Sequence, residues 1–192
     1  MIVRAVVATL LLAALTGLAY PLAMTGIADG LFADHANGSL VVVDGTPVGS
    51  ALIGQAWDGP SWFYSRPSAV SEDASTSGGS NLGPRSLQLA DEITTRAAAI
   101  VALEAPYMPG VTAATIPPDL LTASGSGLDP DISVEAARFQ APRVAAVRGL
   151  TIEQVDALID QHTEGRTLDV LGEPRVNVLE LNVALQEVAP RT

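Results

Sequence analysis

The chain begins with an apolar run, residues 5–27, that no charged residue interrupts. At about 1.5 Å of rise per residue, a helix of this length matches the thickness of the hydrocarbon core of a bilayer. Because a single segment can satisfy its backbone polar groups in lipid only as a helix, the run predicts one membrane-spanning helix. Arg4 precedes the run, and Asp29 and Asp34 follow it. The positive-inside tendency therefore places the N-terminus in the cytoplasm and the rest of the chain outside.

A cleaved signal peptide is the alternative interpretation of this run. A charged start, an apolar core and Gly26-Ile27-Ala28 as a possible cleavage site fit that alternative. Length favours a retained anchor, because the apolar core of a signal peptide spans only about 7–15 residues. Small residues also recur at every fourth position, which predicts a helix face that another helix can approach closely: Ala5, Thr9, Ala13 and Gly17.

Composition excludes several kinds of chemistry. The chain has no cysteine and no lysine, so it forms no disulfide, thiolate metal site, phosphate-binding loop of the Walker type or Schiff base. Its net charge of -11 argues against binding nucleic acid or anionic lipid. Only 4% of the residues are aromatic, which argues against an aromatic-lined ligand groove.

The pattern after the anchor predicts one α+β domain. We expect the anchor to cover residues 1–29 and the soluble domain residues 30–192, a length that can bury a core. Two runs about a Gly/Pro turn predict a hairpin, and a third run predicts a short strand: residues 39–43, 48–53 and 112–116. Caps and apolar spacing predict helices at residues 87–103, 134–148 and 152–162, with Pro142 breaking or kinking the second. Residues 176–188 fit helical spacing but also resemble a strand.

Two Gly/Ser-rich segments, residues 57–84 and 122–133, predict long loops. A loop as long as the first is usually functional or docked against another part of the molecule. The second contains Gly125-Ser126-Gly127 ahead of a helix, but Pro130 stands where the dinucleotide fingerprint needs its third glycine. A tight turn is the favoured interpretation.

Few residues could support catalysis. His35 and His162 are the only histidines, and no serine lies in a G-x-S-x-G motif, which argues against a hydrolase or a metal site. An extracytoplasmic hydrolase would depend on His162. Charged residues cluster around a turn near residue 165, and Arg166 and Arg175 within this cluster are either solvated ion-pair members or partner contacts.

Several longer motifs occur together in order along the chain. They are NGSL before the hairpin, GSALIGQ (49–55), WFYSRPSA (62–69), SGGSNLGP (77–84), TASGSGLDPDIS (122–133), Gln140 with PRVA (142–145), HTEGR (162–166) and LGEPRVNVLELN (171–182). Over nearly its whole length, including the anchor, the chain resembles the C subunit of the bacterial Kdp potassium-transporting P-type ATPase. Residues 71–76 are a mild, insert-like departure within the first loop.

The resemblance implies a non-catalytic subunit of an ATP-driven potassium importer in the cell membrane. Its partners would be a channel-like potassium-binding subunit, an ATP-hydrolysing subunit and a small peptide subunit. The family's C subunit is required for assembly and stability and is described as a catalytic chaperone that raises the affinity of the ATPase subunit for ATP. That description links the position of Gln140 to nucleotide, so ATP is the ligand it suggests. A domain outside the membrane cannot touch cytosolic ATP, so the effect would be transmitted through membrane helices.

The hypothesis drawn from these observations is an extracytoplasmic stabilising cap over the potassium entrance. The small-residue face of the anchor would pack on the channel-like subunit, and the acidic charge would raise the local cation concentration. The candidate partner contacts are Arg66, Asn81, Asp129, Arg166, Arg175 and Asn177. The alternative is a membrane-anchored extracytoplasmic binding module for a small ligand.

Overall fold

A computed structural model describes residues 1–189 of the chain. The chain divides into two compact units, Met1–Leu40 and a domain that begins at Val41. One N-terminal apolar helix is followed by a mixed helix and sheet domain, so the predicted α+β class is confirmed. The anchor boundary predicted after residue 29 falls inside the first unit, near the end of its helix.

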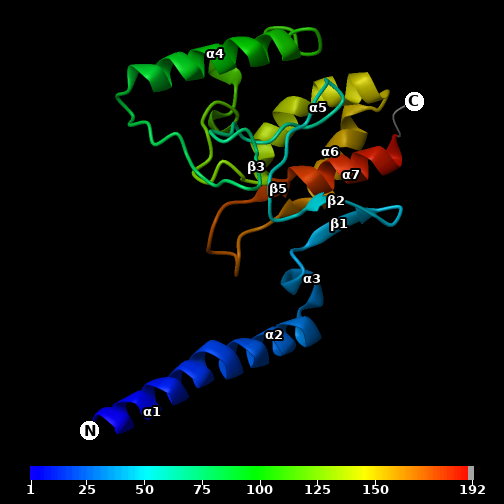
Figure 1. Cartoon of the computed structure of the whole chain (residues 1–192). Coiled ribbons are helices and arrows are strands. Elements are labelled where there is room, and N and C mark those ends of the chain that lie inside the picture. Colours follow the sequence, from blue (N-terminus) through cyan, green and yellow to red (C-terminus); the bar gives the residue numbers. More distant parts are fainter. Residues whose placement is uncertain (190–192) are drawn as a thin grey trace. The chain divides into compact units, whose positions relative to one another are not determined.

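The first unit is built on a continuous helix, Ile2–Leu31, shown in blue in Figure 1. It comprises α1 (Ile2–Ala14), a π-helical turn η1 (Leu15–Ala19) and α2 (Tyr20–Leu31), and a short helix α3 (Ala33–Ala36) follows. None of the residues of α1, η1 and α2 is buried. Within residues 1–189 this is the one helix long and apolar enough to cross a membrane.

The π-helical turn lies just before Pro21, which has no N–H to donate to the preceding turn. The N–H of Tyr20 instead donates to the carbonyl of Leu15, and the Thr16 hydroxyl donates to the Leu12 carbonyl at 2.7 Å. Widened turns and hydroxyl bonds of this kind are how membrane helices accommodate proline.

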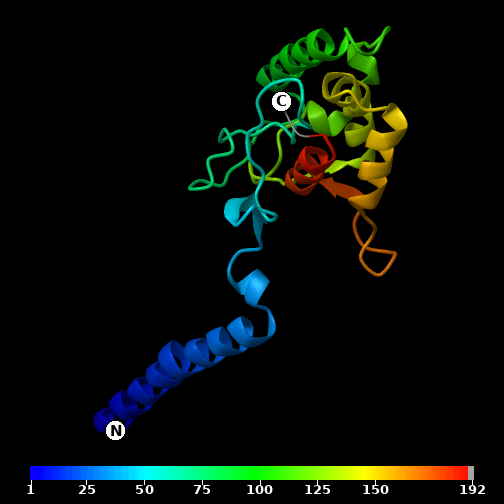
Figure 2. The same cartoon turned by 90° about the vertical axis from the view of Figure 1, so that its right-hand side faces the viewer.

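Up to residue 189, the domain contains a two-stranded and a three-stranded sheet with four long helices. Its elements are β1 (Leu40–Val43), β2 (Thr46–Ser50), α4 (Leu87–Glu104), the 3-10 turns η2 (Ala113–Thr115) and η3 (Pro118–Leu120), β3 (Asp131–Ser133), α5 (Val134–Arg148), α6 (Ile152–Gln161), β4 (Thr163–Glu164), β5 (Arg175–Asn177) and α7 (Val178–Val188). Figures 1 and 2 place α4 at one end of the domain, the β1–β2 hairpin at the other, and α5, α6 and α7 between them.

The core of the domain lies where α5, α6 and α7 pack on the three-stranded antiparallel sheet, in the order β3-β5-β4. Ile132 and Val176 are paired across β3 and β5 and are 2% and 0% exposed. The helices contribute small and branched side chains to this core: Ala136, Ala137, Val144, Val155, Ile159, Leu181 and Leu185. β3 leads directly into α5 and β5 directly into α7, so each strand fixes the start of a core helix.

The helix caps follow the predictions closely. Ser86 caps α4 and Ser133 caps α5, each accepting a hydrogen bond from the N–H three residues later. Thr151 and Gln154 form the predicted capping box of α6. Gly149 ends α5 with φ at 69°, as expected for a glycine after a helix. The predicted hairpin also forms, although β2 ends at Ser50 rather than at residue 53.

One local prediction is wrong, and the structure narrows two others that left alternatives open. Residues 112–116 form no strand, because the Thr115 side chain bonds back to both backbone groups of Thr112 and closes the 3-10 turn η2. α5 runs through Pro142 without a break. Residues 176–188, which fitted either a helix or a strand, form both in turn. Strand β5 ends at Asn177, and the side chain of Asn177 then caps helix α7.

Candidate functional site

The aromatic segment, residues 62–64, is centred on the buried Phe63, although it lies in a long loop between β2 and α4. Phe63 is 0% exposed, and its backbone forms no part of a sheet. Its N–H donates to Asn182 Oδ1 at 2.9 Å, and its carbonyl accepts from Asn182 Nδ2 at 3.0 Å. One side-chain amide of α7 thus replaces the neighbouring strand that Phe63 lacks.

The side-chain amide of Gln140 bonds in the same way to the backbone of Tyr64, the residue after Phe63. The N–H of Tyr64 donates to Gln140 Oε1 at 2.8 Å, and Gln140 Nε2 donates to the Tyr64 carbonyl at 3.1 Å. Gln140 is 2% exposed on α5, and its Oε1 also accepts from Arg143 at 3.0 Å. Both polar atoms of the side chain that the family resemblance links to nucleotide are therefore engaged inside the domain.

Arg143 stands at the centre of this buried polar cluster and is 0% exposed. Its Nε donates to Glu104 Oε1 at 2.7 Å, which ties α5 to the end of α4. Its Nη1 donates to the carbonyls of Pro60 and Trp62 at 2.5 and 2.8 Å. A buried charge needs such a complete set of partners, because removing one leaves an uncompensated charge away from water.

Burial raises the pKa of two acid groups beside the Arg143 guanidinium. It raises the pKa of the Glu104 carboxyl above its usual range, and Arg143 opposes that shift. Burial also raises the pKa of the Tyr64 hydroxyl, again against Arg143, while Asp58 and Glu104 add to the increase. The Tyr64 hydroxyl donates to the Gly59 carbonyl at 2.8 Å. Its ring centroid lies 5.0 Å from the guanidinium carbon of Arg143, within range of a cation–π interaction.

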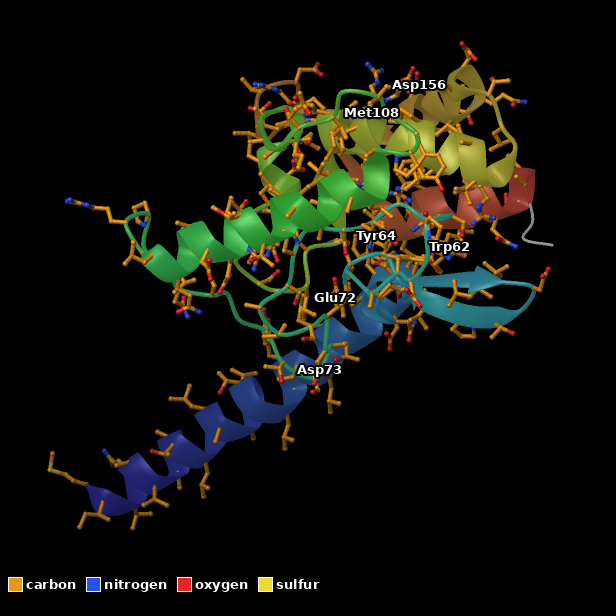
Figure 3. All side chains as sticks on the ribbon, turned by 90° about the horizontal axis from the view of Figure 1, so that it is seen from above. Trp62, Tyr64, Glu72, Asp73, Met108 and Asp156 are labelled. Atoms are coloured by element: carbon orange, nitrogen blue, oxygen red, sulfur yellow. The ribbon has the colours of Figure 1, made fainter. Side chains whose placement is uncertain are left out.

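A second arginine of α5 holds the start of the segment. Arg148 Nε donates to the Ser61 carbonyl at 2.9 Å, and its guanidinium lies 4.3 Å from the ring centroid of Trp62. The ring of Trp57 lies 5.0 Å from that of Trp62. Both rings line a groove of about 580 Å³ between the β1–β2 hairpin and α7. The low aromatic content argued against such a groove, and the structure places the two tryptophans there together. Figure 3 labels Trp62 and Tyr64 on this segment and Glu72 and Asp73 farther along the loop.

The two Gly/Ser-rich loops lie against each other. Ser68 donates to the Gly127 carbonyl at 2.7 Å, and the Gly78 N–H donates to the Ser126 carbonyl at 2.8 Å. A Cβ atom on Gly127 would lie 2.6 Å from the Gly78 carbonyl oxygen, and its φ of 69° also favours glycine. A Cβ atom on Gly79 would likewise lie 2.9 Å from the Gly125 carbonyl oxygen, so these two glycines allow close backbone approach, and the first loop is docked.

The charged candidate partner contacts pair with one another or with nearby carboxylates. Arg66 and Asp129, which were predicted separately, join across the two docked loops at 3.1 Å. Arg166 pairs with Glu173 at 2.7 Å, and both side chains are exposed. Arg175 bridges Glu164 and Asp131, at 2.5 and 3.0 Å. Burial raises the pKa of Asp131, and Arg175 opposes that increase.

The remaining candidates fall in three places. Asn177 caps α7 and donates to the Ala51 carbonyl at 2.8 Å, which fixes the end of the hairpin to the core. Asn81 is exposed and has a φ of 53°. The predicted packing face, with Ala5, Thr9 and Ala13 on α1 and Gly17 in η1, is exposed along the apolar helix.

The two histidines lie in different units of the chain. His35 bonds to Ser39 Oγ at 3.2 Å in the first unit, and His162 follows the last turn of α6. Among residues 1–189, no group of three or more His, Asp or Glu side chains could hold a metal ion.

Sequence reasoning missed Asn182, Arg143 and Glu104 as a group, although a signal was present. Asn182 lies one turn from Val178 and Leu185, on the face predicted to point inward. A polar side chain on an apolar helix face indicates a buried hydrogen-bonding role. The partner of that bond lies 119 residues away, which no local pattern specifies.

Comparison with known proteins decides the family. Residues 2–187 match the family model described as KdpC: K+-transporting ATPase, c chain. The chain belongs to the KdpC family. It is 57% identical over 182 residues to the potassium-transporting ATPase KdpC subunit of Variovorax paradoxus, covering 93% of this chain and 92% of that one. The KdpC subunits of Rhodopseudomonas palustris and Nitratidesulfovibrio vulgaris are 52% and 50% identical, each over 97% of this chain and 96% and 93% of their own. The predicted resemblance is confirmed.

Proposed function

We propose that this chain is an accessory subunit of a potassium-transporting ATPase, needed for the assembly and stability of the complex, and that it has no catalytic activity of its own. The observation that carries the proposal is the match to the KdpC family over residues 2–187, anchor included. The partners proposed are a channel-like potassium-binding subunit, an ATP-hydrolysing subunit and a small peptide subunit.

The proposed topology puts the N-terminus in the cytoplasm and the domain outside. An apolar helix of 30 residues with none buried requires lipid or other helices around it. Arg4 precedes the run and Asp29 follows it, which supports this orientation. The face formed by Ala5, Thr9, Ala13 and Gly17 would then pack against a helix of the channel-like subunit.

Any effect on ATP affinity would, on this topology, be indirect. The amide of Gln140 is engaged by Tyr64 and Arg143, so its proposed role is to hold the aromatic segment in place. A domain fixed in this way could favour one transport state through differential contacts with the membrane subunits. Its net charge of -11 would also raise the cation concentration near the entrance.

The deciding experiment is extraction of membranes with mild detergent, purification through this chain, and measurement of potassium-stimulated ATPase activity in the eluate. Recovery of larger membrane subunits with that activity supports the accessory role. Recovery of this 19.7 kDa chain alone, without ATPase activity, would favour the anchored binding module.

Replacement of exposed acidic residues by their amides tests whether the negative charge raises the local cation concentration. Potassium uptake should then weaken at low potassium and low salt, and unchanged kinetics would rule out this contribution.

A further inference from the structure

A loop between β4 and β5 projects from the domain. Every residue from 164 to 174 is exposed, and both Figure 1 and Figure 2 show this orange loop standing out from the domain body. Its tip carries three large apolar side chains within four residues, Leu168, Val170 and Leu171, which are 82%, 71% and 62% exposed. These side chains contribute nothing to the core of their own domain.

The loop nevertheless has a defined backbone. Its base continues the β4–β5 ladder through the ion pair of Arg166 and Glu173, which lie 2.7 Å apart. Thr167 and Leu171 exchange two backbone hydrogen bonds of 2.8 and 3.0 Å. Between them Leu168 and Asp169 have φ values of 54° and 59°, in the left-handed region that leucine rarely adopts. Strain of this kind gathers at binding and switching sites.

We propose that this tip loop, residues 167–172, docks into an apolar hollow on the extracytoplasmic face of a membrane subunit of the same potassium-transporting complex. The three apolar side chains are buried there, and the Asp169 carboxylate accepts hydrogen bonds from a basic group at the rim of the hollow. The inference rests on the proposed function, since it names a contact through which the subunit would hold its partner.

The charges of the loop favour a protein partner over a lipid surface. Asp169 lies in the middle of the apolar tip, so insertion into a bilayer would carry a carboxylate toward hydrocarbon. Membrane-binding tips are flanked by free basic and aromatic residues, whereas Arg166 and Arg175 are paired with carboxylates and the loop has no lysine or aromatic residue. A protein surface can supply both an apolar hollow and a single complementary charge.

The form of the loop also fits an interface anchor. Binding energy at protein interfaces concentrates in a few side chains that fill pockets, surrounded by contacts that exclude water. The paired charges at the base of the tip, with the 2.7 Å bond between Arg166 and Glu173, would form such a rim. The hairpin presents its apolar residues in a fixed geometry, so little ordering is required on docking.

The test replaces Leu168 by asparagine in the full chain, produced together with the other subunits. Asparagine tolerates the left-handed conformation, so the unfolding temperature of the purified full chain should stay the same or rise. Recovery of the membrane subunits through this chain should fall about tenfold or more, as expected for loss of an anchoring side chain. Leu87→Asn is the matched control, because Leu87 is 88% exposed at the start of α4 and recovery should not change.

A photo-reactive residue at position 170, used in intact membranes, identifies the molecule that the tip loop contacts. Cross-linking to a membrane subunit of the complex supports the proposal, whereas adducts only with lipid, or only with a second copy of this chain, overturn it. Equal recovery with Leu168→Asn and wild type would also overturn the docking while leaving the accessory role intact. If the wild-type chain itself recovers no other subunit, the accessory role fails first.

Discussion

Asn182 satisfies both backbone polar groups of Phe63, through bonds of 2.9 and 3.0 Å across 119 residues of sequence. Because Phe63 is 0% exposed, water cannot take over these bonds if the amide is removed. Asn182→Ala should therefore lower the free energy of unfolding by about 3 kcal/mol, which two unsatisfied buried groups cost. Urea unfolding of the full chain in mild detergent measures this loss. Gln161→Ala, at an exposed position on α6, serves as control and should change stability by less than about 0.5 kcal/mol.

Gln140 allows a sharper comparison, because two mechanisms predict different results. Gln140 could influence the affinity of the complex for ATP only by holding Tyr64. In that case Gln140→Ala and Asn182→Ala should raise the ATP concentration for half-maximal ATPase activity of the complex to a similar extent. Both changes loosen the same segment. Steady-state kinetics of the purified complex make the comparison. A change with Gln140→Ala alone, at equal stability loss in both variants, would indicate a direct contact with nucleotide.

The raised pKa of Glu104 predicts a pH dependence with a definite sign. Since the folded chain holds the proton of this carboxyl more tightly than the unfolded chain, its contribution to stability is fully present below the unfolded pKa. That contribution is lost as the pH rises through the folded pKa. Glu104→Gln lacks this titration. The stability of wild type relative to Glu104→Gln should therefore decrease from about pH 4 upward through the weakly acidic range. Urea midpoints at several pH values test the sign, and an increasing difference would mean that the attraction of Arg143 outweighs burial.

The docked glycine loops predict a contrast between two neighbouring positions. Gly127→Ala forces a Cβ atom to 2.6 Å from the Gly78 carbonyl oxygen at a φ of 69°, so it should destabilise the chain by about 2 kcal/mol or more. Gly125→Ala meets nothing within 4 Å and should have a much smaller effect. Thermal unfolding of the two variants, measured side by side, gives the comparison. Equal effects would mean that the loops do not hold each other as closely as described.

Local signals predicted most of the helices of this chain because their causes are local. Ser86, Ser133 and Thr151 each bond to a backbone N–H three residues away, so the residues that specify the cap also surround it. Gly149 ends α5 by its own φ preference. The same logic explains the error at Thr112, where a side-chain bond to Thr115 outweighed the strand pattern.

The site could be predicted only in part. The sequence predicted that the aromatic loop is functional or docked, and it is docked. The means of docking are side chains on α5 and α7, and the distances in sequence between partners, 76 and 119 residues, leave no periodic trace. Arg66 and Asp129 were predicted as two contacts and turn out to be one pair for the same reason.

The bond between Phe63 and Asn182 also sets an order of events during synthesis. Phe63 leaves the ribosome long before α7, so its two backbone groups must wait unpaired until nearly the whole chain has been made. A chain that ends before residue 182 would therefore carry an exposed phenylalanine and a loop that cannot close. Native structure around Phe63 in the first half of the domain therefore depends on completion of the second half.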